Sequence, residues 1–245
     1  MAVFALYNLK GGVGKTAAAI NLAYLSAADG YKTLIWDLDP QGSSSFYLGV
    51  KANNKNETKK LFAEEIELKD AIQSSAFENL RIIPADISAR NIDTFLSDVK
   101  HSRKKVKSLL SDLKGYDIII LDCPPGISLL HENIFNAANW ILMPNIPTTL
   151  SINSFETVME YFKNNELDED KIKCFFSMVD HRKNLHHEVM QQFYKDKLFF
   201  KSYIPYLSDV EKMGVHQQPL FEYANSSYAA QCFRDLWKEV KKVCL

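Results

Sequence analysis

The chain has 245 residues and a formal net charge of −1, and 47% of its residues are hydrophobic. This length suits one large α/β domain with a sizeable core, so we expect a single domain over residues 1–245. The near-neutral charge excludes a protein that is basic over its whole surface, so any nucleic-acid contact must come from a local patch. The four cysteines are widely spaced, which is typical of a reduced, cytosolic protein rather than of a disulfide or metal framework. No stretch approaches the length of a transmembrane helix.

The chain begins with an apolar run, a glycine-rich turn and an Ala-rich segment. Residues 2–7 are long enough for a buried strand, and residues 17–28 are expected to form a helix. The turn between them reads Asn8-Leu9-Lys10-Gly11-Gly12-Val13-Gly14-Lys15-Thr16. Its glycines allow the backbone to turn tightly and direct N–H groups at phosphate oxygens, and the helix adds its positive dipole end. We therefore expect a nucleotide site in which Lys15 contacts the β- and γ-phosphates and the Thr16 hydroxyl binds Mg²⁺.

Further strands and helices alternate along the chain. Short apolar runs predict strands at 32–37, 80–84, 116–122, 140–144, 172–178 and 203–205. Helical spacing extends over 90–113, from a Ser151 cap to about Asn164, and over 225–245. Residues 51–69 are expected to form a polar surface excursion. This alternation predicts an α/β fold with a mostly parallel twisted sheet and helices on both faces.

Two of the predicted strands end in acids. Asp37 closes the strand at 32–37, with Asp39 two residues later, and Asp122 closes the strand at 116–122. The carboxyl ends of parallel strands are where ligands bind in open α/β sheets. Four apolar residues followed by Asp122 are typical of a Walker B motif, in which the carboxylate holds Mg²⁺ directly or through water.

The sequence Lys-Gly-Gly-Val-Gly-Lys-Thr at 10–16 resembles the deviant Walker A motif of the ParA/MinD family of P-loop ATPases. The strict P-loop pattern has glycine where this chain has Leu9, and the variant adds Lys10. The resemblance implies a P-loop NTPase fold of the SIMIBI/ParA type that binds ATP and Mg²⁺. The implied nucleotide contacts are Gly11, Gly12, Val13, Gly14, Lys15, Thr16 and Ala17, although many members have Thr or Ser in place of Ala17. It also implies that Lys10 reaches the partner's nucleotide in an ATP-sandwich dimer.

The resemblance extends to two later motifs. Asp-Leu-Asp-Pro-Gln-Gly at 37–42 is similar to the family's switch I, and Asp-Cys-Pro-Pro-Gly at 122–126 is similar to its switch II. It implies that Asp39 orients the attacking water and acts in catalysis with Lys10 and Lys15. The implied magnesium site contains Thr16, Asp37 and Asp122, and by position Met178 and Pro205 lie near the adenine.

The chain resembles the small, Soj-like members of the family, which have no N-terminal DNA-binding extension. We therefore expect a cytoplasmic ATPase that dimerises on ATP, hydrolyses it slowly and positions DNA or another cargo with a ParB-like activator or cargo adaptor. Arg182 matches a position that contacts DNA in the family, and Lys183 follows it. Asp209 lies where another arginine is common, and an acid repels phosphate. Further contacts with DNA on the nucleoid would then come from lysines such as Lys212, Lys241 and Lys242.

The main alternative is a MinD-like ATPase that binds a membrane through its C-terminal segment. That segment has helical spacing, with the apolar residues Phe233, Leu236, Trp237, Val240 and Val243. Amphipathic spacing is more often a mark of packing, so we expect this helix to lie on the body of the protein and not on a membrane. His181, His186 and His187 lack a supporting carboxylate or cysteine pattern, so we expect surface loop histidines and not a metal site. The cysteines do not match a nitrogenase-type reductase, and the tail is not tyrosine-rich like that of bacterial tyrosine kinases.

Overall fold

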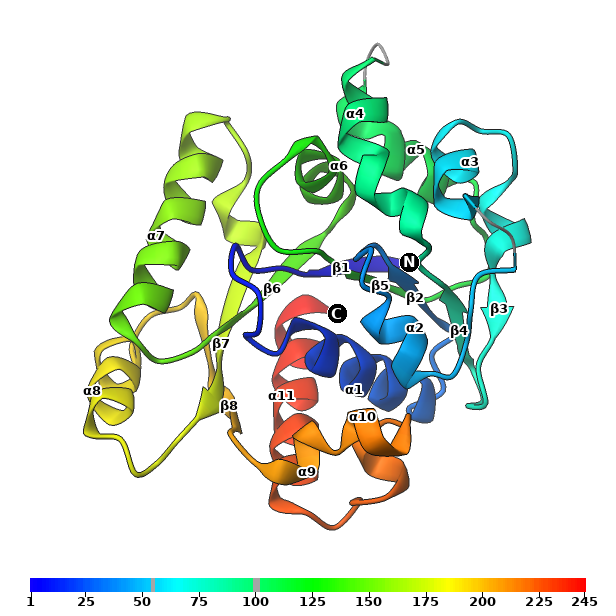
Figure 1. Cartoon of the computed structure of the whole chain (residues 1–245). Helices are drawn as coiled ribbons and strands as arrows, with labels where there is room; N and C mark the ends of the chain where they lie inside the picture. Colours follow the sequence, from blue (N-terminus) through cyan, green and yellow to red (C-terminus); the bar gives the residue numbers. More distant parts are fainter. Residues whose placement is uncertain (54–55, 99–101) are drawn as a thin grey trace.

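A computed structural model describes residues 1–53, 56–98 and 102–245 of the chain. The strands of these residues form one eight-stranded sheet in the order β3-β4-β2-β5-β1-β6-β7-β8 (Figure 1). Neighbouring strands are parallel except for β3 and β4, which confirms the predicted mostly parallel sheet. The strands are β1 (Ala2–Leu6), β2 (Thr33–Asp37), β3 (Gln73–Ser74), β4 (Leu80–Ile83), β5 (Ile118–Asp122), β6 (Trp140–Asn145), β7 (Ile172–Val179) and β8 (Phe199–Pro205).

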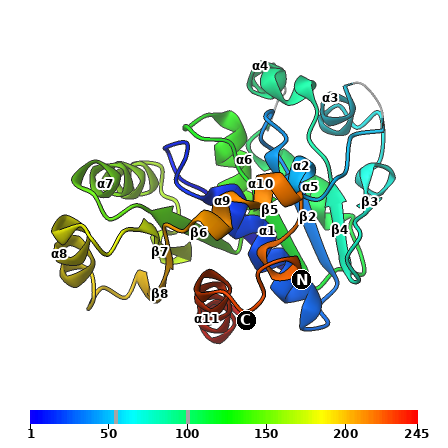
Figure 2. The ribbon, with the colours of Figure 1, turned by 60° about the horizontal axis from the view of Figure 1, so that its bottom comes forward.

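Helices cover both faces of the sheet, as predicted (Figure 2). One face packs against α1 (Lys15–Ala28) and α11 (Tyr228–Cys244), and the other packs against α6 (Leu129–Ala137) and α7 (Thr149–Asn164). The remaining α-helices are α2 (Ser43–Tyr47), α3 (Glu57–Phe62), α4 (Ile92–Ser97), α5 (Lys105–Ser111), α8 (Asn184–Gln192), α9 (Ser208–Glu211) and α10 (Met213–His216). The 3₁₀ turns are η1 (Leu68–Ala71), η2 (Ile87–Asn91), η3 (Ser102–Lys104), η4 (Glu169–Lys171) and η5 (Leu220–Glu222).

The central strands bring the expected site residues to one edge of the sheet. Every residue of β5, Ile-Ile-Ile-Leu-Asp, is buried, because helices cover the sheet on both sides. In the parallel register, Asp122 at the end of β5 lies opposite Leu6 of β1 and Asp37 of β2. The glycine-rich loop leaves β1 directly after Leu6. The loop and the two acids therefore lie together at the carboxyl ends of the strands.

The prediction of a single helix over 90–113 is wrong. Its residues form the end of η2, then α4, then η3 and α5, and Val99 lies outside the described residues. A straight helix of this length would extend about 36 Å, whereas α4 and α5 both pack against α6. Two hydrogen bonds fix this arrangement, from Leu130 N to Asp93 Oδ1 and from Val106 N to Asn133 Oδ1.

Several other predicted boundaries also need correction. The surface excursion at 51–69 contains α3, whose Leu61 and Phe62 are buried in the core, while Asn54 and Lys55 lie outside the described residues. The helix expected from a Ser151 cap begins at Thr149, and the hydroxyl of Ser151 is buried without a hydrogen-bond partner. The last helix begins at Tyr228, where Ser227 Oγ accepts a hydrogen bond from Ala230 N, and not at 225. The strand predicted at 203–205 is the end of the longer β8.

The C-terminal helix α11 packs on the body of the protein, as expected. Its apolar residues Phe233, Leu236, Trp237 and Val240 are buried, although Val243 is exposed. Trp237 Nε1 and Lys241 Nζ both donate to Asp29 Oδ2 at the end of α1, at 2.8 and 2.5 Å. The apolar face that a membrane would need is therefore used within the fold. Within 1–53, 56–98 and 102–245, no helix is long and apolar enough to cross a bilayer.

Candidate nucleotide site

The loop between β1 and α1 has the conformation of a phosphate-binding loop. Gly12 and Gly14 have φ angles of +71° and +91°, which side chains of L-residues rarely tolerate. A Cβ atom on Gly14 would also lie only 2.7 Å from Ser177 Oγ. Helix α1 begins at the next residue, Lys15, so its free N-terminal N–H groups lie directly at the end of the loop, where a phosphate can accept from them.

Asn8 anchors this loop to β6, a role that the sequence did not indicate. Its buried Nδ2 donates to Pro144 O at 2.8 Å and to Asn145 Oδ1 at 3.2 Å. Its Oδ1 accepts from Lys10 N at 2.8 Å, which shapes the start of the loop. No local pattern predicts these contacts, because the partners on β6 lie 136 and 137 residues away along the chain.

The ammonium group of Lys15 lies inside the loop. Its Nζ donates to Lys10 O at 2.8 Å and to Asn8 O at 3.5 Å. Burial lowers the pKa of Lys15, and the nearby charges of Asp122 and Asp39 oppose that change. Phosphate oxygens are stronger acceptors than these neutral carbonyls, so a bound phosphate can take over the donors of Lys15.

Asp122 and Asp37 form a buried pair of carboxylates beside the loop. Asp122 Oδ2 accepts from Ser44 Oγ at 2.7 Å, whereas Asp122 Oδ1 is buried and has no hydrogen-bond partner. Burial raises the pKa of Asp122, and the charge of Asp37 raises it further, while the hydrogen bond from Ser44 lowers it. Neighbouring carboxylates repel each other, and a cation placed between protein and phosphate would relieve that repulsion.

Asp37 is close to Asp122, but its oxygens are already used within the fold. Asp37 Oδ2 accepts from Ser45 N at 2.8 Å and from Ser45 Oγ at 2.7 Å, and its Oδ1 accepts from Asp39 N at 3.3 Å. Burial raises the pKa of Asp37, and these hydrogen bonds lower it. In this structure Asp37 holds helix α2 in place, and its predicted role at the edge of a magnesium site stays a prediction.

The donor set fits Mg²⁺ as a companion of bound phosphate. Mg²⁺ prefers oxygen ligands in octahedral geometry and is usually bound by one or two protein groups together with phosphates and water. Thr16, in the first turn of α1, would supply a hydroxyl, and Asp122, at the end of β5, would supply its unpartnered Oδ1. Among the described residues, no group of three His, Cys, Asp or Glu side chains is arranged to hold a metal ion by itself.

Asp39 lies outside the buried pair, in a tight turn of switch I. It is only half-buried, and its Oδ1 accepts from Gln41 N at 2.9 Å. The backbone of the same turn closes with a bond from Gly42 N to Asp39 O at 2.8 Å. The charge of Asp39 raises the pKa of Lys15, so its carboxylate lies near that ammonium, and its predicted role in catalysis stays a prediction.

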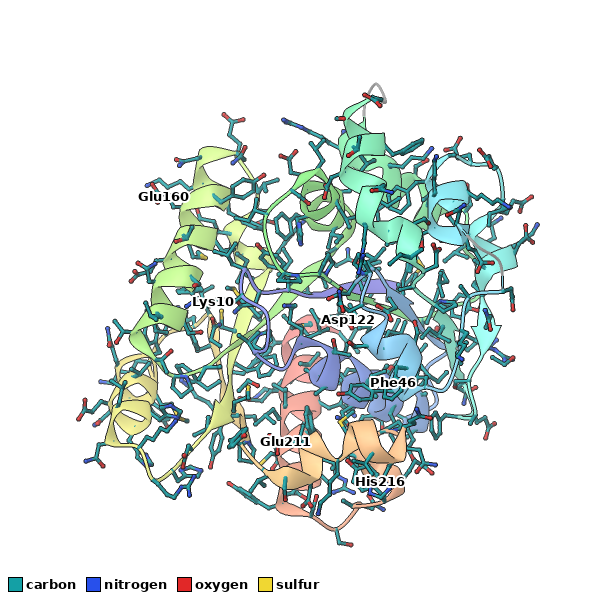
Figure 3. The ribbon with its side chains drawn as sticks, in the orientation of Figure 1. Lys10, Phe46, Asp122, Glu160, Glu211 and His216 are labelled. Atoms are coloured by element: carbon teal, nitrogen blue, oxygen red, sulfur yellow. The ribbon has the colours of Figure 1, made fainter. Side chains whose placement is uncertain are left out.

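Lys10 points away from these acids. Its Nζ donates to Leu150 O at 2.6 Å, in the first turn of α7, and the side chain of Leu150 is 72% exposed. Figure 3 shows Lys10 on the side of the loop that faces α7, while Asp122 lies nearer to α2. The ammonium of Lys10 is thus outside the phosphate-binding space of its own chain.

A largely apolar cavity of about 210 Å³ lies beside the loop, at the end of β7 and β8. Met178 and Pro205, the two predicted adenine neighbours, both line it, together with Gly12, Gly14 and Ala17 of the loop and α1. The sequence did not indicate the other lining residues: Ala18, Tyr47, Ser177, Ile204, Tyr206, Leu207, Val210, Glu211 and Phe233. Its walls and its position next to the loop suit a purine ring joined to the bound phosphates.

The predicted DNA contacts lie on the loop between β7 and α8 and do not line this cavity. Arg182 is exposed, and its guanidinium forms two parallel bonds to Asp180, from Nε to Oδ1 at 2.9 Å and from Nη2 to Oδ2 at 3.0 Å. This guanidinium holds the pKa of Asp180 well below its usual range. Lys183 is exposed, directly before α8. Asp209 forms an ion pair with Lys212, with 3.9 Å between Asp209 Oδ1 and Lys212 Nζ.

The expectation of three surface histidines is wrong for His186. That ring is buried, and its Nδ1 lies 3.0 Å from Asp180 N, which donates to it and fixes the loop ahead of α8. His181 and His187 are exposed, with His187 Nε2 2.9 Å from His181 O. His186 lies in the first turn of α8 rather than in a loop, and spacing alone does not indicate that its ring is a buried acceptor.

Known proteins resemble this chain over most of its length. A family profile described as an AAA domain matches residues 1–173. The chain is 33% identical to the chromosome-partitioning ATPase Soj of Treponema pallidum, over 92% of this chain and 89% of that protein. It is 29% identical to the sporulation initiation inhibitor protein Soj of Bacillus subtilis, over 97% of each. A putative plasmid partition protein of Borrelia burgdorferi, solved with AMPPNP, shares the fold with a TM-score of 0.84 at 19% identity over 99% of both chains.

Proposed function

The chain belongs to the ParA/MinD family of P-loop ATPases, and on this premise we propose that it is a switch that positions DNA or a protein cargo. ATP would close two copies into a dimer, and slow hydrolysis, stimulated by a ParB-like activator or cargo adaptor, would separate them. The observation that carries this proposal is Lys10. Its ammonium donates to Leu150 O in the first turn of α7 and so lies outside its own phosphate-binding space, where it would be free to meet the nucleotide of a second copy.

The described contacts support a role for each residue of the site. Residues 11–17 would surround the phosphates, Lys15 would neutralise the β- and γ-phosphates, and Thr16 with Asp122 would hold Mg²⁺. Asp39, half-exposed at the rim, would orient the attacking water. Met178 and Pro205 would contact the adenine in the 210 Å³ cavity. Phosphoryl transfer depends mainly on such positioning and charge neutralisation, since the protein takes little part in covalent chemistry.

We further propose a cytoplasmic location and weak, non-specific DNA binding in the ATP state, through Arg182 and Lys183. Arg182 is held by Asp180, so phosphate must compete with an ion pair, and Asp209 on α9 is an acid that repels phosphate. A dimer doubles every contact, and two weak sites on one body combine through effective concentration. Binding should therefore be detectable at low salt and fall steeply as salt rises.

We expect Arg182→Glu to abolish DNA binding at low salt and Asp180→Asn to strengthen it, because the second change frees the guanidinium. A mobility-shift assay with ATP, ADP or no nucleotide measures both effects. A plot of log affinity against log salt concentration should become less steep, by about 1 unit of slope for each phosphate contact that is lost. Lys69→Glu, the same kind of charge change at an exposed site on η1, is the matched control and should bind as the wild type does.

The same assay tests the positioning function itself. Binding that requires ATP and is lost with ADP supports a nucleotide switch that acts on DNA. If the wild type binds no DNA in either state at low salt, the cargo is not DNA, and the proposal is then restricted to a protein scaffold. Equal loss of binding in Arg182→Glu and Lys69→Glu would show a general charge effect and contradict the assigned contact.

A further inference from the structure

Helix α2 carries two consecutive serines that hold the two buried acids of the site. Ser44 Oγ donates to Asp122 Oδ2 at 2.7 Å, and Ser45 contacts Asp37 through both its N–H and its hydroxyl. Both serines are buried. Ser45 Oγ also accepts from Ala85 N at 3.0 Å, after the end of β4. The position of α2 is therefore fixed by Ser45, and the bond from Ser44 to Asp122 is an additional one.

The two oxygens of Asp122 have different surroundings. Oδ2 is held by Ser44, while Oδ1 is buried and has no hydrogen-bond partner. A buried carboxylate oxygen without a partner is costly, and such an atom calls for a ligand or another explanation. Lys15, at the end of the phosphate-binding loop, is close enough to this carboxylate for the two charges to interact.

The χ2 torsion of an aspartate, which rotates its carboxylate, has a broad and roughly two-fold distribution. Burial alone therefore does not fix the direction of each oxygen. A hydrogen bond to one oxygen fixes the plane of the group and thereby the direction of the other. Groups that orient a metal ligand in this way often change metal affinity or activity by about 10- to 100-fold when they are removed.

We propose that Ser44 is a positioning residue for the metal site: it holds Asp122 Oδ2 and thereby turns Oδ1 toward the divalent cation that accompanies the nucleotide. This inference rests on the proposed function and deepens it. It adds a residue of helix α2 that would act on the metal only through Asp122. It also gives the two neighbouring serines different roles: Ser45 fixes helix α2 to Asp37, and Ser44 fixes the carboxylate of Asp122.

The coupling between Mg²⁺ and nucleotide binding tests this assignment. The full-length chain is titrated with a fluorescent ATP analogue in Mg²⁺ and again in EDTA, and the ratio of the two affinities is the coupling. Ser44→Ala should reduce this ratio about tenfold, because the oriented oxygen is lost. The affinity in EDTA should stay within a factor of about two of the wild-type value, since no nucleotide contact is removed.

Ser43→Ala is the matched control, because Ser43 is the preceding residue of α2 and its side chain makes no hydrogen bond to the described residues. It should keep the wild-type ratio. A ratio for Ser44→Ala that equals that of Ser43→Ala would overturn the inference. Equal losses for Ser44→Ala in Mg²⁺ and in EDTA would also overturn it, because they indicate a structural role. If the wild type itself shows no Mg²⁺-dependent gain, the proposed function fails before any variant is compared.

Discussion

Lys10→Ala is expected to lower the rate of ATP hydrolysis by about 10³-fold or more, the effect seen when a cation supplied in trans to the transferred phosphate is removed. The affinity of the isolated chain for ATP should change little. The reason is that Lys10 Nζ contacts Leu150 O on α7 and none of the groups that surround the phosphates of its own chain. Phosphate release at saturating ATP and equilibrium nucleotide binding measure the two quantities separately.

The control for this variant is Lys163→Ala, which removes an exposed lysine farther along the same helix, α7. It should hydrolyse ATP as the wild type does. Full hydrolysis by Lys10→Ala would show that the partner's lysine is not needed and would remove the sandwich arrangement from the mechanism.

Asp39→Asn and Asp39→Ala are both expected to slow hydrolysis by about 10² to 10⁴, the usual contribution of a positioned general base or water-orienting group. The asparagine variant keeps an oxygen that can accept from Gln41 N, so it preserves the turn while it removes the charge. ATP affinity should remain within a few-fold, because the loop, Lys15 and Asp122 are unchanged. Single-turnover hydrolysis and nucleotide affinity provide the comparison.

The two Asp39 variants also separate catalysis from structure. If only Asp39→Ala is impaired, the turn at Gln41 matters and the charge does not. If both variants lose ATP binding altogether, Asp39 is needed to form the site and is not the residue that orients water.

The fold was predictable where burial on both faces makes a strand uniformly apolar. The run Ile118 to Leu121 and its neighbours have no polar alternation, because helices cover the sheet on each side. The segment 90–113 was not predictable in the same way. Its apolar spacing fits one helix as well as two short helices, and the choice depends on how Asp93 and Asn133 bond across to α6 and α5.

In the candidate site, too, some residues could be predicted from the sequence and others could not. The loop residues and Asp37, Asp39 and Asp122 are recognisable from short local motifs, and the sheet register brings them together. The residues that hold them were not recognisable. Ser44 bonds to a residue 78 positions away, and Asn8 bonds to residues 136 and 137 positions away, so no local window contains both partners.

The mass of the chain in solution, with and without ATP, tests the central claim of a nucleotide-driven dimer most directly. Sedimentation or light scattering is measured for Asp39→Ala, in which hydrolysis is expected to be slow, and for the wild type, each with Mg²⁺. The expected mass is 28.0 kDa without nucleotide or with ADP, and twice that value with ATP. Lys10→Ala serves as the comparison for the contact between copies. A mass that stays at 28.0 kDa for both proteins at saturating ATP and Mg²⁺ would contradict the dimer, and with it the role given to Lys10.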